Sequence, residues 1–138
     1  AFLSKEKYSV LTPGDHGSTY GGNPLACAAA YAVVNHVVEN NIITNVIKSG
    51  NRLKEGLKQF IDKYELINEV RGTGLLLAME FKSDISAQLV SLSNEEGLLL
   101  NPVRPNAIRF MPPLNISEEE VDIGLSRLEQ ALSKLVST

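Results

Sequence analysis

The stretch LINEVRGTGLLLAMEF, residues 66–81, is where the hydrophobic pattern of the chain changes. Ahead of it, apolar residues recur at the three- and four-residue spacing of a helix with one buried face. Within it, two short aliphatic runs flank Gly72-Thr73-Gly74, an arrangement typical of two strands joined by a tight turn. The stretch therefore predicts that helices give way to a sheet.

Two helices are predicted before this pair of strands. Asn23 is a favoured N-cap and Pro24 suits the first helical position, so the first helix is expected from about Pro24 to Glu39. A second helix is expected over residues 43–64, where the apolar side chains keep mostly to one face. The chain thus enters the sheet from a helical segment.

The region after the strands predicts a short helix, two more strands and a closing helix. DISAQLVSLSNEEG (residues 84–97) is typical of a helix closed by glycine, and LLLNP (98–102) and AIRFMPP (107–113) indicate short strands. Ser117 and Glu120 form a capping box before an amphipathic final helix. Because the strands cluster between helices, the predicted fold class is α+β, with a small, mainly antiparallel sheet covered by helices.

The composition restricts the classes of function. The chain has 138 residues, is 43% hydrophobic and 21% charged, and carries a formal net charge of −3. Lysine and arginine do not cluster and no apolar run approaches the roughly 18 residues of a membrane span, so neither nucleic acid nor a membrane is expected as a partner. Cys27 is the only cysteine, which excludes an internal disulfide and a multi-cysteine metal site and fits a cytoplasmic protein.

Residues 14–24, GDHGSTYGGNP, combine four glycines with two hydroxyls ahead of the first helix. Backbone without bulky side chains can approach a ligand closely, and a helix N-terminus favours an anion, so Ser18 and Thr19 predict a phosphate or carboxylate site. Ordinary turns are the alternative interpretation of the glycines. The spacing matches neither the Walker nor the dinucleotide-binding pattern, and Ser18 with His16 lacks the third member of a hydrolase site.

The longer segment PGDHGSTYGGNPLACAAA, residues 13–30, resembles the signature that follows the cofactor-binding lysine in class-III, fold-type-I aminotransferases. The segments VRGTGLLLAMEF (70–81) and IRFMPPLNIS (108–117) resemble later landmarks of the same family, in the same order. The likeness is greatest to acetylornithine and ornithine aminotransferases, and covers only the last part of the family's chain. It implies pyridoxal 5'-phosphate as cofactor and a homodimer.

The resemblance also implies roles for individual residues. Thr19 would bind the cofactor phosphate of the neighbouring subunit, and Ser18 would lie near the substrate. Arg109 would pair with the α-carboxylate of the amino-acid substrate, which suits the planar fork of a guanidinium. Arg71 is expected to be structural, and His16 to stabilise the loop.

The resemblance implies that the catalytic lysine lies upstream of residue 1. No catalytic residue is therefore assigned within the chain, and the 138 residues alone are expected to be inactive and to bind pyridoxal phosphate weakly or not at all. Three parts are expected: residues 1–22 as the end of the large cofactor-binding domain, 23–40 as a bridging helix, and 41–138 as the small C-terminal domain.

The implied reaction moves the terminal amino group of N-acetylornithine or ornithine to 2-oxoglutarate, as in arginine biosynthesis. A 4-aminobutyrate or succinylornithine aminotransferase is an alternative on the same scaffold. A non-catalytic α+β interaction module is an alternative of another class.

Overall fold

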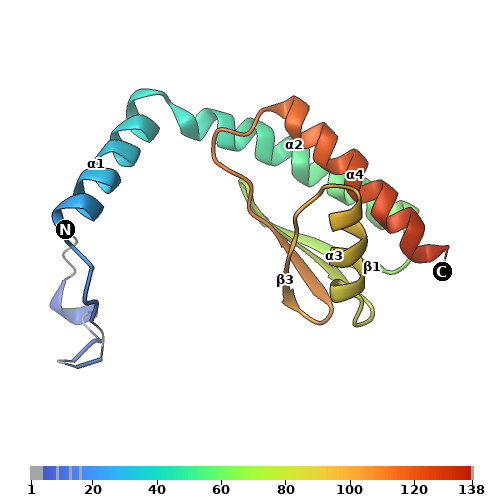
Figure 1. The fold of residues 1–138 in the computed structure, drawn as a ribbon, viewed down its shortest axis with the longest axis horizontal. Helices are drawn as coiled ribbons and strands as arrows, with labels where there is room; N and C mark the ends of the chain where they lie inside the picture. Colours follow the sequence, from blue (N-terminus) through green and yellow to red (C-terminus); the bar gives the residue numbers. More distant parts are fainter. Residues whose placement is uncertain (1–4, 9, 13, 16, 138) are drawn as a thin grey trace. The chain divides into compact units, whose positions relative to one another are not determined.

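A computed structural model describes residues 5–8, 10–12, 14–15 and 17–137 of the chain. These residues belong to two compact units, Ala1–His36 and Val37–Thr138 (Figure 1). The boundary falls inside the last turn of the first long helix. The predicted three-part division places its boundaries at other positions, and it stays a prediction.

The N-terminal unit contains a short 3₁₀ helix, η1 (Glu6–Tyr8), the glycine-rich loop and most of helix α1 (Pro24–Glu39). The bounds of α1 are those predicted from the sequence, and Asn23 is its N-cap, since the Asn23 Oδ1 atom accepts a hydrogen bond from the Ala26 N–H at 3.0 Å. None of the residues of α1 is buried. The segment AFLS, residues 1–4, has a strand-like sequence and lies outside the described residues.

The C-terminal unit begins its core with helix α2 (Ile42–Lys63). Leu53, Leu57 and Phe60 recur at three- and four-residue spacing and are buried, as the sequence pattern predicts. The opposite face of the helix is charged and exposed. A single amphipathic helix of this length needs a partner surface, and the sheet supplies it.

The sheet has four antiparallel strands in the order β1-β2-β4-β3. Their bounds are β1 (Ile67–Thr73), β2 (Leu76–Phe81), β3 (Asn101–Arg104) and β4 (Ala107–Phe110). The sequence prediction of a strand in LLLNP is wrong in its start, because β3 begins only at Asn101. In the observed register, Leu98 would lie opposite Pro112, and proline has no N–H group to continue the ladder.

The turn between β1 and β2 depends on glycine. Gly72 and Gly74 both have positive φ, of 124° and 53°. A Cβ atom added at Gly72 would lie 2.2 Å from the Leu76 carbonyl oxygen. The predicted tight turn is therefore confirmed, and a side chain at this glycine would collide with the opposite strand.

Helices α3 (Ser86–Glu95) and α4 (Glu118–Val136) complete the C-terminal unit. The predicted capping box of α4 is confirmed: the Ser117 Oγ atom accepts from the Glu120 N–H at 3.2 Å, and the Glu120 carboxylate accepts from the Ser117 N–H at 2.8 Å. The hydrogen bond from the Ser117 backbone, followed by the one from its hydroxyl, lowers the pKa of Glu120. The helix therefore starts at a fixed residue.

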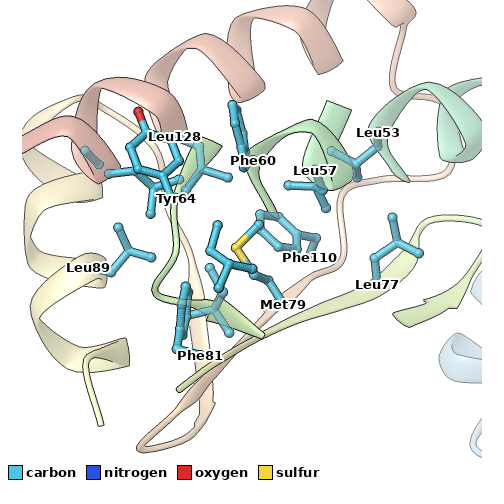
Figure 2. Packing of buried hydrophobic residues seen from close by; sticks show 14 of the residues in the cluster. Leu53, Leu57, Phe60, Tyr64, Leu77, Met79, Phe81, Leu89, Phe110 and Leu128 are labelled. Carbon is cyan, nitrogen blue, oxygen red and sulfur yellow. The ribbon is translucent and has the colours of Figure 1, made fainter. Parts of the chain in front are cut away.

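One hydrophobic core lies between the helices and one face of the sheet. In Figure 2, side chains from α2, α3 and α4 point toward Leu77, Met79 and Phe81, the alternate residues of β2, and toward Phe110 of β4. Leu57, Met79 and Ile108 are fully buried. Figure 1 shows α2 and α4 side by side along this face. The outcome is the predicted α+β fold, in which the other face of the sheet carries polar side chains such as Arg71 and Arg109 beside the smaller Ala78. Among the described residues, no helix is long and apolar enough to span a membrane.

Candidate functional site

The glycine-rich loop of the N-terminal unit is closed by one of its own hydroxyls. The Ser18 Oγ atom accepts a hydrogen bond from the Gly21 N–H at 2.8 Å. A Cβ atom added at Gly21 would lie 2.9 Å from this oxygen, so the turn is tight as well as bonded. Ser18, expected near the substrate, thus has a conformational role within the loop that the sequence did not indicate.

Thr19 differs from its neighbour. It is exposed, and among the described residues its hydroxyl has no hydrogen-bond partner. Cβ atoms added at Gly17 and Gly22 would meet nothing within 4 Å, so the backbone beside these glycines is open. A free hydroxyl beside open backbone is a donor set that fits a phosphate group.

The start of α1 offers fewer free donors than the sequence suggested. Pro24 has no N–H, the Ala26 N–H donates to Asn23 Oδ1, and the Cys27 N–H donates to the Asn23 carbonyl at 3.0 Å. Leu25 is left as the residue of this turn whose N–H can face a ligand. An anion here would therefore depend on the loop more than on the helix end. His16, expected to stabilise the loop, lies outside the described residues.

Asp15 fixes the beginning of the same loop. Its carboxylate accepts from the Thr12 N–H at 2.7 Å and from the Thr12 hydroxyl at 2.9 Å. The backbone hydrogen bond, followed by the hydroxyl one, lowers the pKa of Asp15. This carboxylate is engaged with Thr12 and does not take up the donors of residues 17–22, of which the Gly21 N–H is bonded to Ser18 Oγ.

The face of the sheet opposite the core carries a row of aligned residues, one from each strand. Arg71 of β1 pairs with Ala78 of β2, Ala78 pairs with Arg109 of β4, and Arg109 pairs with Asn101 of β3. Directly paired residues of antiparallel strands lie on the same face. The row therefore holds two arginines separated by the small side chain of alanine.

The two arginines of the row have different surroundings. Arg71 Nη1 donates to Glu69 Oε1 and to Glu80 Oε2, each at 3.0 Å. Its charge is met by two carboxylates of the same face. Arg71 is thereby held by the sheet itself, in agreement with the structural role expected of it.

Arg109 is half-buried, and among the described residues no carboxylate lies within ion-pair distance of it. Its Nε atom is buried and has no hydrogen-bond partner in that part of the chain. A buried donor on a cation is costly when it is not satisfied, so this nitrogen is suited to an acceptor that arrives from outside the chain. The sequence placed the Arg109 side chain on the face opposite Ile108 and Phe110, and the strand register agrees with that placement.

Asn101 is the polar neighbour of Arg109 that sequence reasoning missed. With its side-chain amide oriented so that the oxygen faces the guanidinium, Asn101 Oδ1 accepts from Arg109 Nη2 at 2.9 Å. A β-bulge makes this pairing: the register shifts between Pro102 and Arg104, so that Val103 is the extra residue. An unbulged hairpin would place Asn101 opposite Phe110, and no signal in the single sequence marks the bulge.

A cavity of about 370 Å³ opens beside Asn101 and Arg109. Its other walls are mostly aliphatic side chains from the segment before β3 and from α2 and α4. Helices α2 and α4 pack on the core face of the sheet, whereas the Arg109 side chain lies on the opposite face, so this cavity is not assigned to the row of arginines. Within the described residues, no group of three His, Cys, Asp or Glu side chains could hold a metal ion.

A glycine-rich loop ahead of a helix, and an arginine with an unpartnered buried donor on a small antiparallel sheet, are the features to compare with known proteins. Residues 1–132 match the family model "Aminotransferase class-III". The chain belongs to the class-III aminotransferase family. The expected family is thus confirmed, and so is the fold class.

The chain is similar to named members of this family. The chain is 42% identical to an acetylornithine aminotransferase of Caldanaerobacter subterraneus over 98% of its own length and 34% of that protein. It resembles the crystal structure of an acetylornithine aminotransferase from Elizabethkingia anophelis with a TM-score of 0.78 and 38% identity, covering 90% of this chain and 32% of the other. The ornithine aminotransferase from Toxoplasma gondii, whose active site is described with partial occupancy of PLP, gives a TM-score of 0.79 and 34% identity, over 91% and 31%. The chain thus spans about a third of these relatives.

Proposed function

We propose that the whole protein is a pyridoxal-phosphate-dependent aminotransferase that moves the terminal amino group of N-acetylornithine, or of ornithine, to 2-oxoglutarate. The proposal rests on one observation above the others: the Nε atom of Arg109 is buried and has no partner within the described residues. In a family whose substrates are amino acids and oxo acids, a carboxylate is the acceptor that would satisfy this donor. The names of the relatives support the choice of substrates.

Arg109 would bind and orient the substrate carboxylate. A guanidinium presents parallel N–H donors that match the two oxygens of a carboxylate. Because the side chain is half-buried and is paired with no carboxylate of the described residues, none of these residues neutralises its charge. The substrate is thereby held by one end, which leaves its other end free to approach the reacting centre.

Thr19 would hold the phosphate of the cofactor, with Ser18 keeping the loop in the required shape. When bound, pyridoxal phosphate supplies the electrophilic aldehyde carbon and the electron sink for amino-group transfer. The free hydroxyl of Thr19 and the open backbone at Gly17 and Gly22 support this assignment. As the family resemblance implies, the phosphate would belong to the other subunit of a homodimer.

The remaining assignments follow from the same resemblance. We place the whole protein in the cytoplasm and in arginine biosynthesis, and we expect the 138 residues alone to be inactive, because half of a site cannot complete the reaction. The alternatives are a 4-aminobutyrate or succinylornithine aminotransferase. A profile of amino donors, measured on the whole protein with 2-oxoglutarate as acceptor, decides among them. Preference for a donor other than N-acetylornithine or ornithine contradicts the proposal.

The role of Arg109 is tested by comparing it with the other arginine of the row. In the whole protein, Arg109→Ala is expected to raise the KM for 2-oxoglutarate by about 10- to 100-fold, the range of a lost charged hydrogen-bonded contact. Arg71→Ala, which removes an arginine already paired with Glu69 and Glu80, is the control and should change this KM less than about threefold. Equal effects of the two changes would refute the assignment.

The role of Thr19 is tested by changing the hydroxyl without changing the shape of the side chain. Thr19→Val should weaken the retention of pyridoxal phosphate by roughly 10-fold, because it removes a hydrogen bond to a charged group. Thr19→Ser keeps the hydroxyl and should retain the cofactor nearly as the parent protein does. Cofactor dissociation is followed by absorbance after dialysis, and equal retention in the two variants would contradict the assignment.

A further inference from the structure

We propose that Asn101 is a positioning residue for the carboxylate-binding arginine: it fixes the guanidinium of Arg109 so that the unpaired Nε edge faces the incoming carboxylate. The inference rests on the proposed function, since it assigns a further residue to the same site. It starts from the register of the β3–β4 hairpin, in which Asn101 lies directly opposite Arg109.

The contact itself restricts one end of the guanidinium. With the Asn101 amide oriented so that its oxygen faces the guanidinium, Asn101 Oδ1 accepts from Arg109 Nη2 at 2.9 Å. An arginine side chain has many rotamers, and the loss of this freedom is part of what a binding site must overcome. A hydrogen bond made before the ligand arrives removes part of that cost, because the side chain is already in the bound orientation.

The uncharged amide suits this task better than a carboxylate would. Arg71, the other arginine of the row, is held by two carboxylates, and its charge is met by them. An amide oxygen accepts the same kind of hydrogen bond without cancelling the charge. Asn101 therefore holds Arg109 in place while its positive charge stays available for the ligand.

The buried Nε atom shows which part of the guanidinium is left for that ligand. Nη2 has its acceptor in Asn101, whereas Nε has none among the described residues. The bulge at Val103 brings Asn101 onto this face, since a regular ladder continued from the Arg104–Ala107 pair, with Val103 opposite Ile108, would place Pro102 opposite Arg109. The hairpin thus supplies one acceptor for Nη2 and none for the buried Nε.

The test uses the whole protein and three variants. Asn101→Leu removes the acceptor at similar volume, and Asn101→Asp keeps an acceptor but adds a charge. Asn68→Leu, at an exposed asparagine of the other edge strand, is the matched control. The KM and kcat for 2-oxoglutarate are measured, together with the dissociation constant of 2-oxoglutarate by titration calorimetry.

Asn101→Leu is expected to raise the KM and the dissociation constant about threefold to tenfold, the effect of one hydrogen bond, with kcat changed less than twofold. Asn101→Asp is expected to raise both further, because its carboxylate competes with the substrate for Arg109. A merely structural asparagine predicts the reverse order, since aspartate would keep the hydrogen bond. Asn68→Leu should leave all values unchanged.

The outcomes separate this inference from the proposed function. If the protein transfers amino groups and Arg109→Ala raises the KM while both Asn101 variants behave as the parent protein, the positioning role is refuted and the function stands. If the parent protein transfers no amino group to 2-oxoglutarate, the proposed function is refuted. The dissociation constants of 2-oxoglutarate measured by calorimetry then test the positioning role by themselves. Equal dissociation constants for the parent protein and Asn101→Leu overturn it in either case.

Discussion

The two units of the chain differ in what holds them together. The C-terminal unit encloses a core of fully buried side chains, among them Leu57, Met79 and Leu128. The N-terminal unit carries a well-formed helix, α1, with no buried residue and with apolar side chains such as Leu25 and Val34 exposed. Helical propensity and capping can define a helix, whereas only burial gives the larger part of its stability. Equivalent mutations in the two units should therefore change the free energy of unfolding by different amounts.

The largest expected effect comes from matched leucines, one in each unit. Leu57→Ala removes a fully buried side chain and should lower the free energy of unfolding by about 2–5 kcal/mol. Leu25→Ala, at a residue that is 79% exposed, should change it by less than about 0.5 kcal/mol. Urea titrations of the 138-residue chain, followed by circular dichroism, measure both. A loss above about 1 kcal/mol for Leu25→Ala would show that α1 is packed against the core in solution.

The next effect separates two helical glycines of the C-terminal unit. A Cβ atom at Gly50 in α2 would lie 2.6 Å from the backbone carbonyl atoms of Gly74, so Gly50→Ala should destabilise the unit by about 1–3 kcal/mol. Gly124 in α4 has open space at the same position, and Gly124→Ala should stabilise by up to about 1 kcal/mol through helix propensity. The same urea titrations apply. Shifts of the same sign would mean that the approach of α2 to the β1–β2 turn is looser than described.

A smaller effect compares the caps of two helices. Ser117→Ala removes the hydroxyl that accepts from the Glu120 N–H and should cost about 1 kcal/mol of unfolding free energy. Asn23→Ala removes the corresponding bond in α1, and it should lower the helical signal without moving the urea midpoint of the C-terminal unit. If Asn23→Ala moves that midpoint as much as Ser117→Ala, the two units unfold together.

The smallest effect is a dependence on pH within the C-terminal unit. Hydrogen bonds from the backbone and hydroxyl of Ser117 lower the pKa of Glu120 from its usual 4.5, so the unfolded chain binds the proton first as the pH falls. These hydrogen bonds to the Glu120 carboxylate stabilise the folded state above about pH 4.5. That stabilisation is lost as the pH falls through the lower pKa that Glu120 has in the folded state. Urea midpoints of the parent chain and Glu120→Gln should therefore converge in acid. Glu119→Gln, one residue earlier, is the control, and convergence of the same size there would contradict the prediction.

Much of the fold could be predicted because local signals and burial agree in the C-terminal unit. The amphipathic pattern of α2, the glycines between β1 and β2 and the capping box at Ser117 each indicate one structure. The start of β3 was predicted wrongly in LLLNP, because aliphatic composition suggests a strand where the prolines after β4 stop the pairing. Strand propensity is a property of one short segment, whereas pairing of two strands also requires N–H donors on the partner strand.

The candidate site could be predicted only in part. The resemblance to the family assigned Thr19 and Arg109, and those assignments stay predictions. The contact between Asn101 and Arg109 could not be found, because the register depends on one unpaired residue that no short motif announces. The hydroxyl of Ser18 was counted for a ligand, while the structure uses it as an acceptor for the Gly21 N–H. A polar side chain in a short loop can bond to the backbone of that loop or to a ligand. The sequence alone does not distinguish these two roles.

The bulge at Val103 has a consequence for how this hairpin can vary among related proteins. A strand presents its side chains in alternation, so one residue more or less shifts the alternation for everything beyond it. If Val103 were paired with Ile108 instead of bulged, Pro102, which has no acceptor side chain, would lie opposite Arg109 in the place of Asn101. Pairing is therefore as informative as identity: an asparagine aligned with Asn101 is equivalent to it only in hairpins whose length and bulge together place it opposite the aligned arginine.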